Sequence, residues 1–411
     1  MIDITLIRKD PKLIQKSSAD KGVEIDAEHI LELDNKVRGL DLIVQKLREE
    51  RNKAAKEKDI EKGKKLKVQL EKDESSLNAV QSELDNELIK IPNIPTKDVP
   101  QGHDESENKE IKKWGKIKKF TFEPKDHLEL GEALDIIDVK TAAKVSGSRF
   151  AYLKNEGVIL EFALKQLAFD LLIKEGFIPI IPPVLVHKEI IEKEGYLALG
   201  EDEMFKTKDE NLFLVATAEQ SMIPIHKDEI INEKDLPKRY VGFSTSFRRE
   251  AGSYGKDTKG IFRVHQFDKV EMVSFTTEEN GDKEHEYLLS LEEKLFQLLE
   301  IPYRVIKMCT GDLGFPTARK YDLEAWIPSE KKYREVTSVS TTTDFQSRRL
   351  NIKYQKGNEK KFVHILNGTA FSMNRPIIAI LENFQQKDGS VNIPKVLQKY
   401  TNFSKISTKS S

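Results

Sequence analysis

Residues Phe247 to Glu271 read FRREAGSYGKDTKGIFRVHQFDKVE, and this stretch decides the fold. It predicts two strands flanking a loop in which Gly252, Gly255 and Gly260 allow the chain to turn. An ordinary amphipathic hairpin would show the same alternation. Arginines and carboxylates on one face beside a glycine loop favour a phosphate site instead, because Arg contacts phosphate through two parallel hydrogen bonds. The residues that alternation places on this face are Ser244, Ser246, Arg248 and Glu250 on the first strand, and Arg263, His265, Phe267, Lys269 and Glu271 on the second.

The composition is that of a charged globular protein. A chain of 411 residues, 38% hydrophobic and 33% charged, is long enough for two or three domains. The formal net charge of -1 gives no overall attraction to nucleic acid, so a polyanion would need a local basic patch. With Cys309 as the single cysteine and no histidine pair at metal-ligand spacing, we expect neither disulfides nor zinc. Early charged residues exclude a signal-peptide core and no apolar run spans a membrane, so we expect a cytoplasmic protein.

The first hundred residues carry two heptad patterns that the rest of the chain lacks. In the first, apolar residues alternate in spacing between three and four: Ile30, Leu33, Val37, Leu40, Val44 and Leu47, with Arg51 and Ala54 in register. The second pattern consists of Leu66, Leu70, Leu77, Val80 and Leu84. The polar segment 56–63 lies between them, which predicts an antiparallel helical hairpin over about residues 27–90.

Basic residues outnumber acidic ones near the predicted tip of this hairpin. A coiled coil with a solvated surface would show this excess. An arm that follows a phosphate backbone through many weak contacts would show it too. The candidate nucleic-acid contacts are Lys46, Arg48, Arg51, Lys53, Lys56, Lys64 and Lys65.

The remainder of the chain predicts an α+β domain. Three prolines in segment 91–100 end the helix, and a charged connector follows to about Lys119. Strands and helices then mix without a regular β-α-β repeat, which favours an antiparallel sheet with packed helices. A predicted helix from Gly157 to Ile173 leads into GFIPIIPPVLV, where two adjacent prolines suit only an edge or bulged strand. The predicted domains are residues 1–105 and 106–411.

A second candidate anion site lies near the C-terminus. KFVHILNGTAF predicts a strand and a turn, and RPIIAILENFQ predicts a helix with Pro376 at its first position. Arg375 then lies at the helix N-terminus, where backbone amides and the helix dipole favour an anion. The local pattern fits an ordinary surface arginine as well as a phosphate ligand.

The segment 247–271 resembles motif 2 of class II aminoacyl-tRNA synthetases, in the version found in seryl-tRNA synthetases. The likeness rests on FR-x-E, the loop AGSYGKDTKG and the closing R-x-HQF-x-KVE. It extends over essentially the whole chain, from MIDITLIRKDP to ILENFQ. The resemblance implies a class II antiparallel sheet flanked by helices, with an N-terminal coiled-coil arm that binds tRNA. GFIPIIPPVLV resembles motif 1, which builds a dimer interface, and RPIIAILENFQ resembles motif 3.

The resemblance also implies an ATP site. Arg248 would contact the α-phosphate, Arg375 the γ-phosphate, and both would act in catalysis together with Glu335. Glu335 and Ser338 would hold Mg²⁺ through ATP, which suits oxygen ligands in small number. The implied ATP residues are Arg248, Arg249, Glu250, Ile261, Phe262, Arg263, Val264, Glu335, Val336, Thr337, Ser338 and Arg375.

A serine site is implied beside the ATP site, with Thr217, Ala218, Glu219, Arg248, Glu271 and Thr369. Carboxylates can accept from the substrate ammonium and hydroxyl, and a pocket built to pair a hydroxyl rejects alanine by about 10⁴-fold. The implied reaction activates L-serine with ATP and transfers it to tRNA(Ser), and also to tRNA(Sec) where that tRNA exists. It needs positioning and charge neutralisation rather than an acid-base pair. We therefore expect His265 to be structural, and we favour a fold role for Asp322 and Glu324.

The implied partners are tRNA(Ser), held by its long variable arm and acceptor end, and a second copy of the chain. Two alternatives remain: a synthetase-like enzyme that loads a carrier protein, and a non-catalytic RNA-binding paralogue. Some residues depart from the usual family pattern and put the fine shape of the pocket in question. They are Val339, Thr341, Phe371, Met373 and Asn374.

Overall fold

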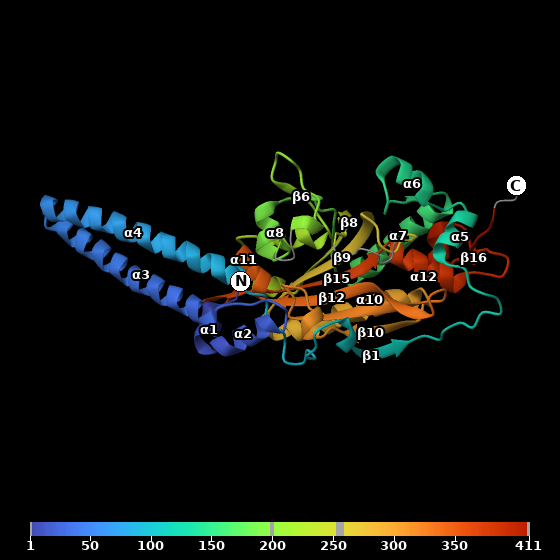
Figure 1. Ribbon diagram of the computed structural model, residues 1–411, viewed down its shortest axis with the longest axis horizontal. Helices are drawn as coiled ribbons and strands as arrows, with labels where there is room; N and C mark the ends of the chain where they lie inside the picture. Colours follow the sequence, from blue (N-terminus) through green and yellow to red (C-terminus); the bar gives the residue numbers. More distant parts are fainter. Residues whose placement is uncertain (1, 198–200, 252–258, 409–411) are drawn as a thin grey trace. The chain divides into compact units, whose positions relative to one another are not determined.

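The structure is a computed structural model that describes residues 2–197, 201–251 and 259–408. It divides into two compact units, Met1–Ile94 and Pro95–Ser411 (Figure 1). The division falls inside the proline-rich segment 91–100. In the described part of the chain, no helix combines the length and the apolar character needed to cross a membrane.

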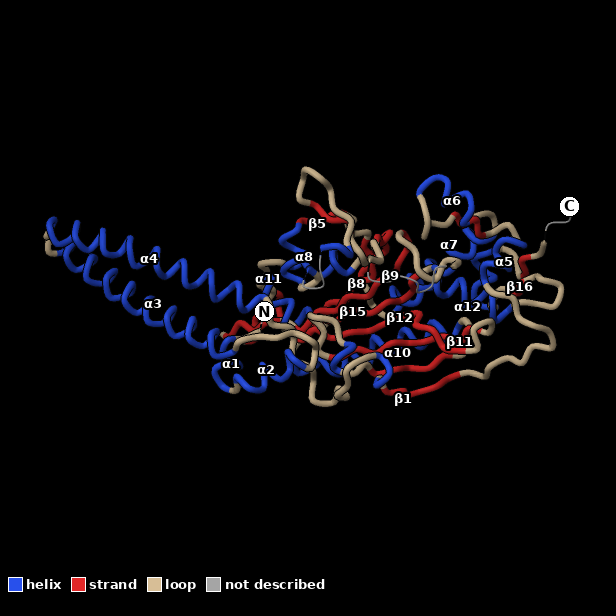
Figure 2. Tube along the Cα trace, in the orientation of Figure 1, coloured by secondary structure: helices blue, strands red, loops and turns tan. Residues whose placement is uncertain are grey.

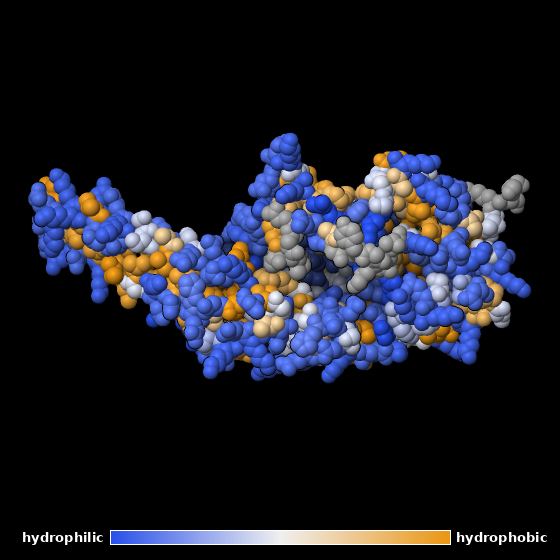
Figure 3. Space-filling model, in the orientation of Figure 1, coloured by the Kyte–Doolittle hydropathy of each residue, from blue (hydrophilic) through white to orange (hydrophobic). Residues whose placement is uncertain are grey.

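The first unit is helical. Two long antiparallel helices lie side by side in it (Figure 2), and apolar residues run between them on an otherwise mostly hydrophilic surface (Figure 3). Ile30, Leu33, Val44 and Leu84 of the predicted seams are buried, which confirms the coiled-coil hairpin. The helices are α1 (Ile4–Lys9), α2 (Pro11–Ala19), α3 (Ala27–Lys56) and α4 (Ile60–Ile89).

The turn of the hairpin is shorter than the predicted segment 56–63. Helix α3 continues to Lys56 and α4 already begins at Ile60. Asp59 caps α4 by accepting a hydrogen bond from the Lys62 backbone N–H at 3.0 Å, so this polar stretch starts a helix instead of extending the loop.

The second unit is built on one large sheet, with eight strands in its described part. All neighbouring pairs are antiparallel except β4 with β8, which confirms the predicted α+β class. In spatial order the strands are β1 (Lys109–Trp114), β10 (Tyr303–Lys307), β11 (Arg319–Ile327), β12 (Lys332–Thr343), β15 (His364–Ser372), β9 (Gln266–Thr276), β8 (Lys238–Phe247) and β4 (Ile178–Ile180).

Helices and short sheets surround this sheet. The helices are α5 (His127–Ala133), α6 (Val139–Ser146), α7 (Glu156–Lys174), α8 (Lys188–Glu194), α9 (Glu219–Met222), α10 (Gly281–Leu298), α11 (Phe345–Leu350), α12 (Asn374–Phe384) and α13 (Gln398–Thr401). The short sheets pair β2 (Ile137–Asp138) with β3 (Tyr152–Leu153), β5 (Leu185–His187) with β6 (Leu212–Leu214), β16 (Val391–Asn392) with β17 (Lys405–Ile406), and order β14 (Glu359–Phe362), β13 (Lys353–Lys356) and β7 (Ile230–Asn232).

Helix α10 packs on one of the two faces of the large sheet. Met272 of β9 and Val339 of β12 lie in one core cluster with Leu288 and Leu295 of α10. Because side chains alternate along a strand, Lys269 and Glu271 point to the opposite face. The apolar face is therefore covered by α10, and the polar face is left for the site.

Several local predictions need correction. The predicted connector before Lys119 contains the edge strand β1, whose lysine-rich sequence has no apolar alternation to reveal it. Strand β8 ends at Phe247 and β9 begins at Gln266. Arg248 and Glu250 therefore follow the first strand instead of lying on it, and Arg263 and His265 precede the second. Pro376 is the third residue of α12, still inside the first turn, where no backbone donor is needed. The glycine-loop residues 252–258 lie outside the described residues.

Candidate active site

A cavity of about 320 Å³ brings together sequence-distant residues from β9, β11, β12, β15, α12 and the segment between β8 and β9. Arg249 and Ile261 do not line it, because Arg249 is exposed and Ile261 is buried in the core. The predicted ATP residues in its lining are Arg248, Glu250, Phe262, Arg263, Val264, Glu335, Val336, Thr337, Ser338 and Arg375.

Arg375 and Glu335 form an ion pair in this cavity. The Arg375 Nη1 lies 3.1 Å from Glu335 Oε1, and Arg375 comes from the first turn of α12. Burial alone would raise the pKa of Glu335, but Arg375 and Lys320 lower it to about 2. Glu335 is therefore an anion at neutral pH, and Arg375 neutralises part of its charge.

The segment between β8 and β9 carries a second charged pair. Glu250 has a φ of 52° and accepts a hydrogen bond at 2.7 Å from Arg263 Nη1. His265 has the structural role that we expected: its Nδ1 lies 2.9 Å from the Arg248 carbonyl oxygen, and its ring contacts Phe150 and Phe205. The imidazole thus fixes the backbone of the arginine.

A second cavity of about 380 Å³ adjoins the first. Of the predicted serine residues, Thr217, Glu219 and Arg248 line this second cavity, whereas Thr369 lines the first. Ala218 and Glu271 line neither cavity, and neither has any exposed surface. Glu271 contacts the lining of the second cavity through two of its partners, Thr217 and Lys269.

Glu271 is compensated by one cation and two hydroxyl groups. Lys269 Nζ lies 2.5 Å from Glu271 Oε2, and the hydroxyls of Thr217 and Thr369 donate to the same carboxylate at 3.3 and 3.4 Å. Burial raises the pKa of Glu271 to about 7, and Lys269 opposes this shift. The carboxylate is thus held beneath Thr217 and Lys269, which line the second cavity.

The sequence analysis missed Lys320 and Tyr196 in the cavity linings, and it placed Lys269 on the polar face without giving it a role. Lys269 and Lys320 line both cavities, together with Arg248 and Ser338. The signal for Lys320 was its two-residue spacing from Asp322, whose Oδ1 lies 3.1 Å from Lys320 Nζ. Tyr196 lines the second cavity and donates a hydrogen bond to Glu219, but nothing in its local sequence indicates this contact.

The departures from the family pattern lie mostly away from the cavities. Val339, Phe371 and Met373 are fully buried in the core cluster beneath the sheet. Thr341 is buried as well, and only Asn374 lines the first cavity. These substitutions change core packing more than cavity shape.

The basic residues of the arm are exposed at all seven predicted positions. Arg48 is also paired, because its Nη2 lies 2.7 Å from Glu74 Oε1 on the facing helix. The lysines therefore present most of the accessible positive charge.

Two protein families match the chain. Residues 204–384 match the tRNA synthetase class II core domain (G, H, P, S and T), and residues 1–95 match the Seryl-tRNA synthetase N-terminal domain. The crystal structure of seryl-tRNA synthetase from Pyrococcus horikoshii complexed with ATP has a TM-score of 0.94 and 41% identity, with 100% of both chains covered. The crystal structure of cytoplasmic serine-tRNA ligase from Naegleria fowleri in complex with AMP has a TM-score of 0.90 and 32% identity to this chain. The match covers 100% of this chain and 99% of the Naegleria fowleri chain.

The fold and the site thus define a class II aminoacyl-tRNA synthetase. The serine--tRNA ligase of Dictyoglomus turgidum is 46% identical to the chain over 424 residues, with 100% of both sequences covered. The chain belongs to the seryl-tRNA synthetase family, as the resemblance of segment 247–271 predicted.

Glu194, beside the second cavity, leads to a prediction on stability. Its side chain is fully buried, and neither carboxylate oxygen has a hydrogen-bond partner among the described residues. Burial raises the pKa of the Glu194 carboxyl well above 4.5, and the negative charge of Glu219 raises it further. The folded protein keeps this proton while the unfolded chain releases it, so stability from this group falls as pH rises above 4.5.

We therefore expect Glu194→Gln to increase the free energy of unfolding relative to the parent protein, by an amount that grows with pH at roughly 1.4 kcal/mol per unit. Denaturant unfolding at pH 5, 6, 7 and 8 measures the difference. Glu192→Gln, on the same helix but partly exposed, is the control. A difference that does not change with pH contradicts the prediction.

Proposed function

We propose that the protein activates L-serine with ATP to seryl-adenylate and transfers the seryl group to the 3′ end of tRNA(Ser) and, where it exists, tRNA(Sec). The observation that carries the proposal is the junction of the two cavities. Arg248, Lys269, Lys320 and Ser338 line both. Three cations therefore stand where an amino-acid carboxylate would meet the α-phosphate of a nucleotide.

ATP occupies the first cavity in this proposal. Arg248 contacts the α-phosphate at the junction, and Arg375 contacts the γ-phosphate from the N-terminus of α12, where the helix dipole adds to its charge. The Phe262 ring offers a stacking surface, with the Arg334 guanidinium 3.9 Å from its centroid. The structures from Pyrococcus horikoshii and Naegleria fowleri are complexes with ATP and AMP, which supports a nucleotide site.

Serine occupies the second cavity. Glu219 accepts from its ammonium, while the group formed by Thr217, Thr369 and Glu271 pairs with its polar atoms. A substrate without a matching hydroxyl would leave these buried groups unpaired, which is the basis of discrimination against alanine.

The reaction needs two group transfers. A serine carboxylate oxygen attacks the α-phosphorus, the bond from that phosphorus to the β-phosphate oxygen breaks, and pyrophosphate leaves. A ribose hydroxyl oxygen at the tRNA 3′ end then attacks the seryl carbonyl carbon, and the bond from that carbon to the AMP phosphate oxygen breaks. AMP leaves, and the hydroxyl proton passes to solvent water. Arg248, Lys269 and Lys320 neutralise the charge that develops at the junction.

The donor set of the first cavity fits Mg²⁺ held jointly with ATP. Glu335 is anionic and Ser338 lines both cavities, so each can offer an oxygen. No group of three or more His, Cys, Asp or Glu side chains able to hold a metal occurs within residues 2–197, 201–251 and 259–408, so the nucleotide itself has to supply ligands. When bound, Mg²⁺ would neutralise phosphate charge.

The basic arm is the proposed contact for the long variable arm of the tRNA. Seven exposed basic residues on α3 and α4 offer many weak phosphate contacts, and the match to the seryl-tRNA synthetase N-terminal domain supports this role. A synthetase-like enzyme that loads a carrier protein would have no tRNA for the basic arm to bind. A non-catalytic paralogue would not need Arg248, Glu335 and Arg375 in one cavity. We expect the protein to act in the cytosol.

The first test is ATP–pyrophosphate exchange across all twenty amino acids. We expect exchange with serine, dependent on Mg²⁺, and a loss of about 100-fold or more in Arg375→Ala, because a preorganised cation is removed from the phosphate site. Arg348→Ala, in α11 and outside both cavities, is the control and should retain activity. Exchange with another amino acid but not with serine would reject the substrate assignment.

The second test concerns the arm. Replacing Lys53, Lys56, Lys64 and Lys65 by Ala should raise the KM for tRNA and reduce the slope of log KM against log salt, by up to about one for each phosphate that is no longer neutralised. Serine-dependent exchange needs no tRNA and serves as the internal control, which should be unchanged. Unaltered charging kinetics at all salt concentrations would eliminate the arm as the site of tRNA binding.

We also propose a homodimer through the segment that resembles motif 1. Ile159 and Phe162 of α7 are 41% and 58% exposed, and Ile181 after β4 is 85% exposed. Phe162 and Ile159 line a hollow of about 870 Å³ between α7 and α13, whose lining mixes apolar and polar side chains. Exposed apolar side chains gathered in one place mark an association surface.

Phe162→Asp should therefore convert the dimer to a monomer, because the interface would have to bury an unpaired carboxylate. Sedimentation velocity measures the change. Leu42→Asp is a matched control, since Leu42 has the same 58% exposure but lies on α3. A parent protein that is already monomeric, or an unchanged dimer in Phe162→Asp, would refute this interface.

A further inference from the structure

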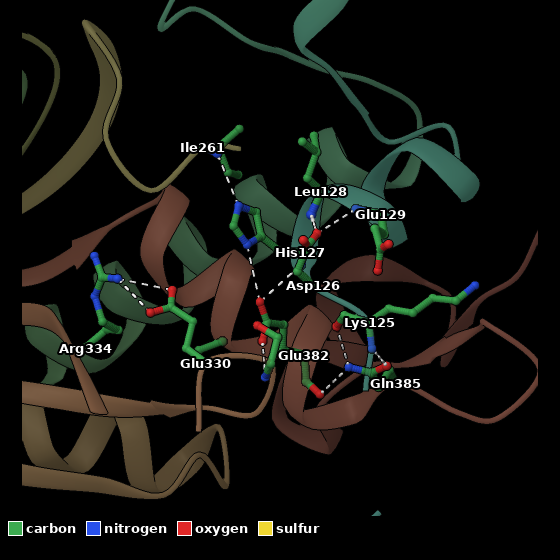
Figure 4. Close-up of polar contacts among 12 residues, drawn as sticks. Lys125, Asp126, His127, Leu128, Glu129, Ile261, Glu330, Arg334, Glu382 and Gln385 are labelled. Carbon is green, nitrogen blue, oxygen red and sulfur yellow. Dashed lines mark hydrogen bonds and ion pairs between the residues drawn. The ribbon is translucent and has the colours of Figure 1, made fainter. Parts of the chain in front are cut away.

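A histidine outside both cavities joins the two segments that build the nucleotide site. His127, the first residue of α5, is buried between Ile261 and Glu382 (Figure 4). Its Nε2 accepts a hydrogen bond from the Ile261 backbone N–H at 3.3 Å, and its Nδ1 lies 3.3 Å from Glu382 Oε1. A backbone N–H can only donate, so this network assigns the tautomer with its proton on Nδ1, donated to the carboxylate.

The position of His127 is fixed by α12 and by its own helix. Glu382 is fully buried and also accepts from the backbone N–H groups of His127 and Ser329, at 3.1 and 3.0 Å. Gln385 bonds to both backbone groups of Lys125, at 2.8 and 2.9 Å (Figure 4). The imidazole therefore cannot move unless α12 or the start of α5 moves with it.

Ile261 is held from its other side as well. Asn374, the first residue of α12, donates from Nδ2 to the Ile261 carbonyl oxygen at 3.1 Å. Gly260 has a φ of 72°, and a methyl group there would collide with the His127 imidazole. We call His127, Asn374 and Glu382 the Ile261 clamp, because together they fix both backbone groups of that residue to α12.

The Ile261 clamp also positions Phe262, the next residue in the chain. The Phe262 ring lines the first cavity, with the guanidinium groups of Arg334 and Arg375 at 3.9 and 5.1 Å from its centroid. Arg334 is held in turn by Glu330, 2.8 Å away. A shift of Ile261 would therefore move the ring away from the cations beside the proposed nucleotide.

We propose that His127 is a positioning residue for nucleotide binding: it holds Ile261, and through it Phe262, in the geometry that the nucleotide contacts. It touches neither nucleotide nor serine. This inference rests on the proposed ATP site and adds to it a residue with no place in the three motifs.

The test compares His127→Ala, His127→Gln and His226→Ala. His226 is a matched control: it is buried, its ring nitrogens contact Glu229 at 2.6 Å and Tyr240 at 2.9 Å, and it lines neither cavity. We expect His127→Ala to raise the KM for ATP and the Kd for ATP about ten-fold, because a buried N–H is left without its acceptor, with the KM for serine unchanged. His127→Gln keeps an acceptor and should recover part of the loss. His226→Ala should lower the Tm without changing either KM.

Nitrogen-15 NMR of the His127 ring gives a readout independent of activity, and the Nδ1-protonated form is expected. An Nε2-protonated ring, an ATP KM within two-fold of the parent in His127→Ala, or an equal rise in both KM values would each overturn the inference. Absence of serine-dependent exchange in the parent protein would instead reject the proposed function, and direct ATP binding by the variants would still test the clamp.

Discussion

The ion pair between Lys269 and Glu271 is the interaction on which the site depends. A carboxylate without exposed surface is costly unless it is paired and hydrogen-bonded. Lys269 and the hydroxyls of Thr217 and Thr369 supply those partners, and they come from β9, β15 and the segment before α9. Satisfying one buried charge thus brings three parts of the chain together, and the second cavity lies above them.

The same cations serve both cavities. Lys269 compensates Glu271, while Lys320 pairs with Asp322, in which burial raises the pKa to about 7. Burial would lower the pKa of Lys320, but Asp322 and Glu335 raise it, so this lysine stays charged. The positive charge at the junction is therefore built into the resting protein, with no need to recruit it when substrates arrive. Preorganisation of this kind is what makes electrostatic stabilisation effective.

Much of this architecture could be predicted from the sequence, because it depends on local patterns. The heptads of α3 and α4 predicted the hairpin, and alternation along β9 separated Lys269 and Glu271 from Val270 and Met272. The rest depends on pairing between distant segments. Strand β1 is recognised only by its register against β10, and no local rule connects His127 to Glu382 across 255 residues. Tyr196 likewise meets Glu219 only through the packing of the loop after α8.

Helix α12 carries Arg375 in its first turn and Glu382 two turns later, and Asn374 at its start bonds to Ile261. One helix thus supports both Phe262, through Ile261, and Arg375 in the proposed nucleotide site. A substitution that displaces α12 would therefore disturb Arg375 and the Ile261 clamp at the same time. Because contacts at Phe262 and at Arg375 share one support, their contributions to nucleotide affinity are not expected to be additive.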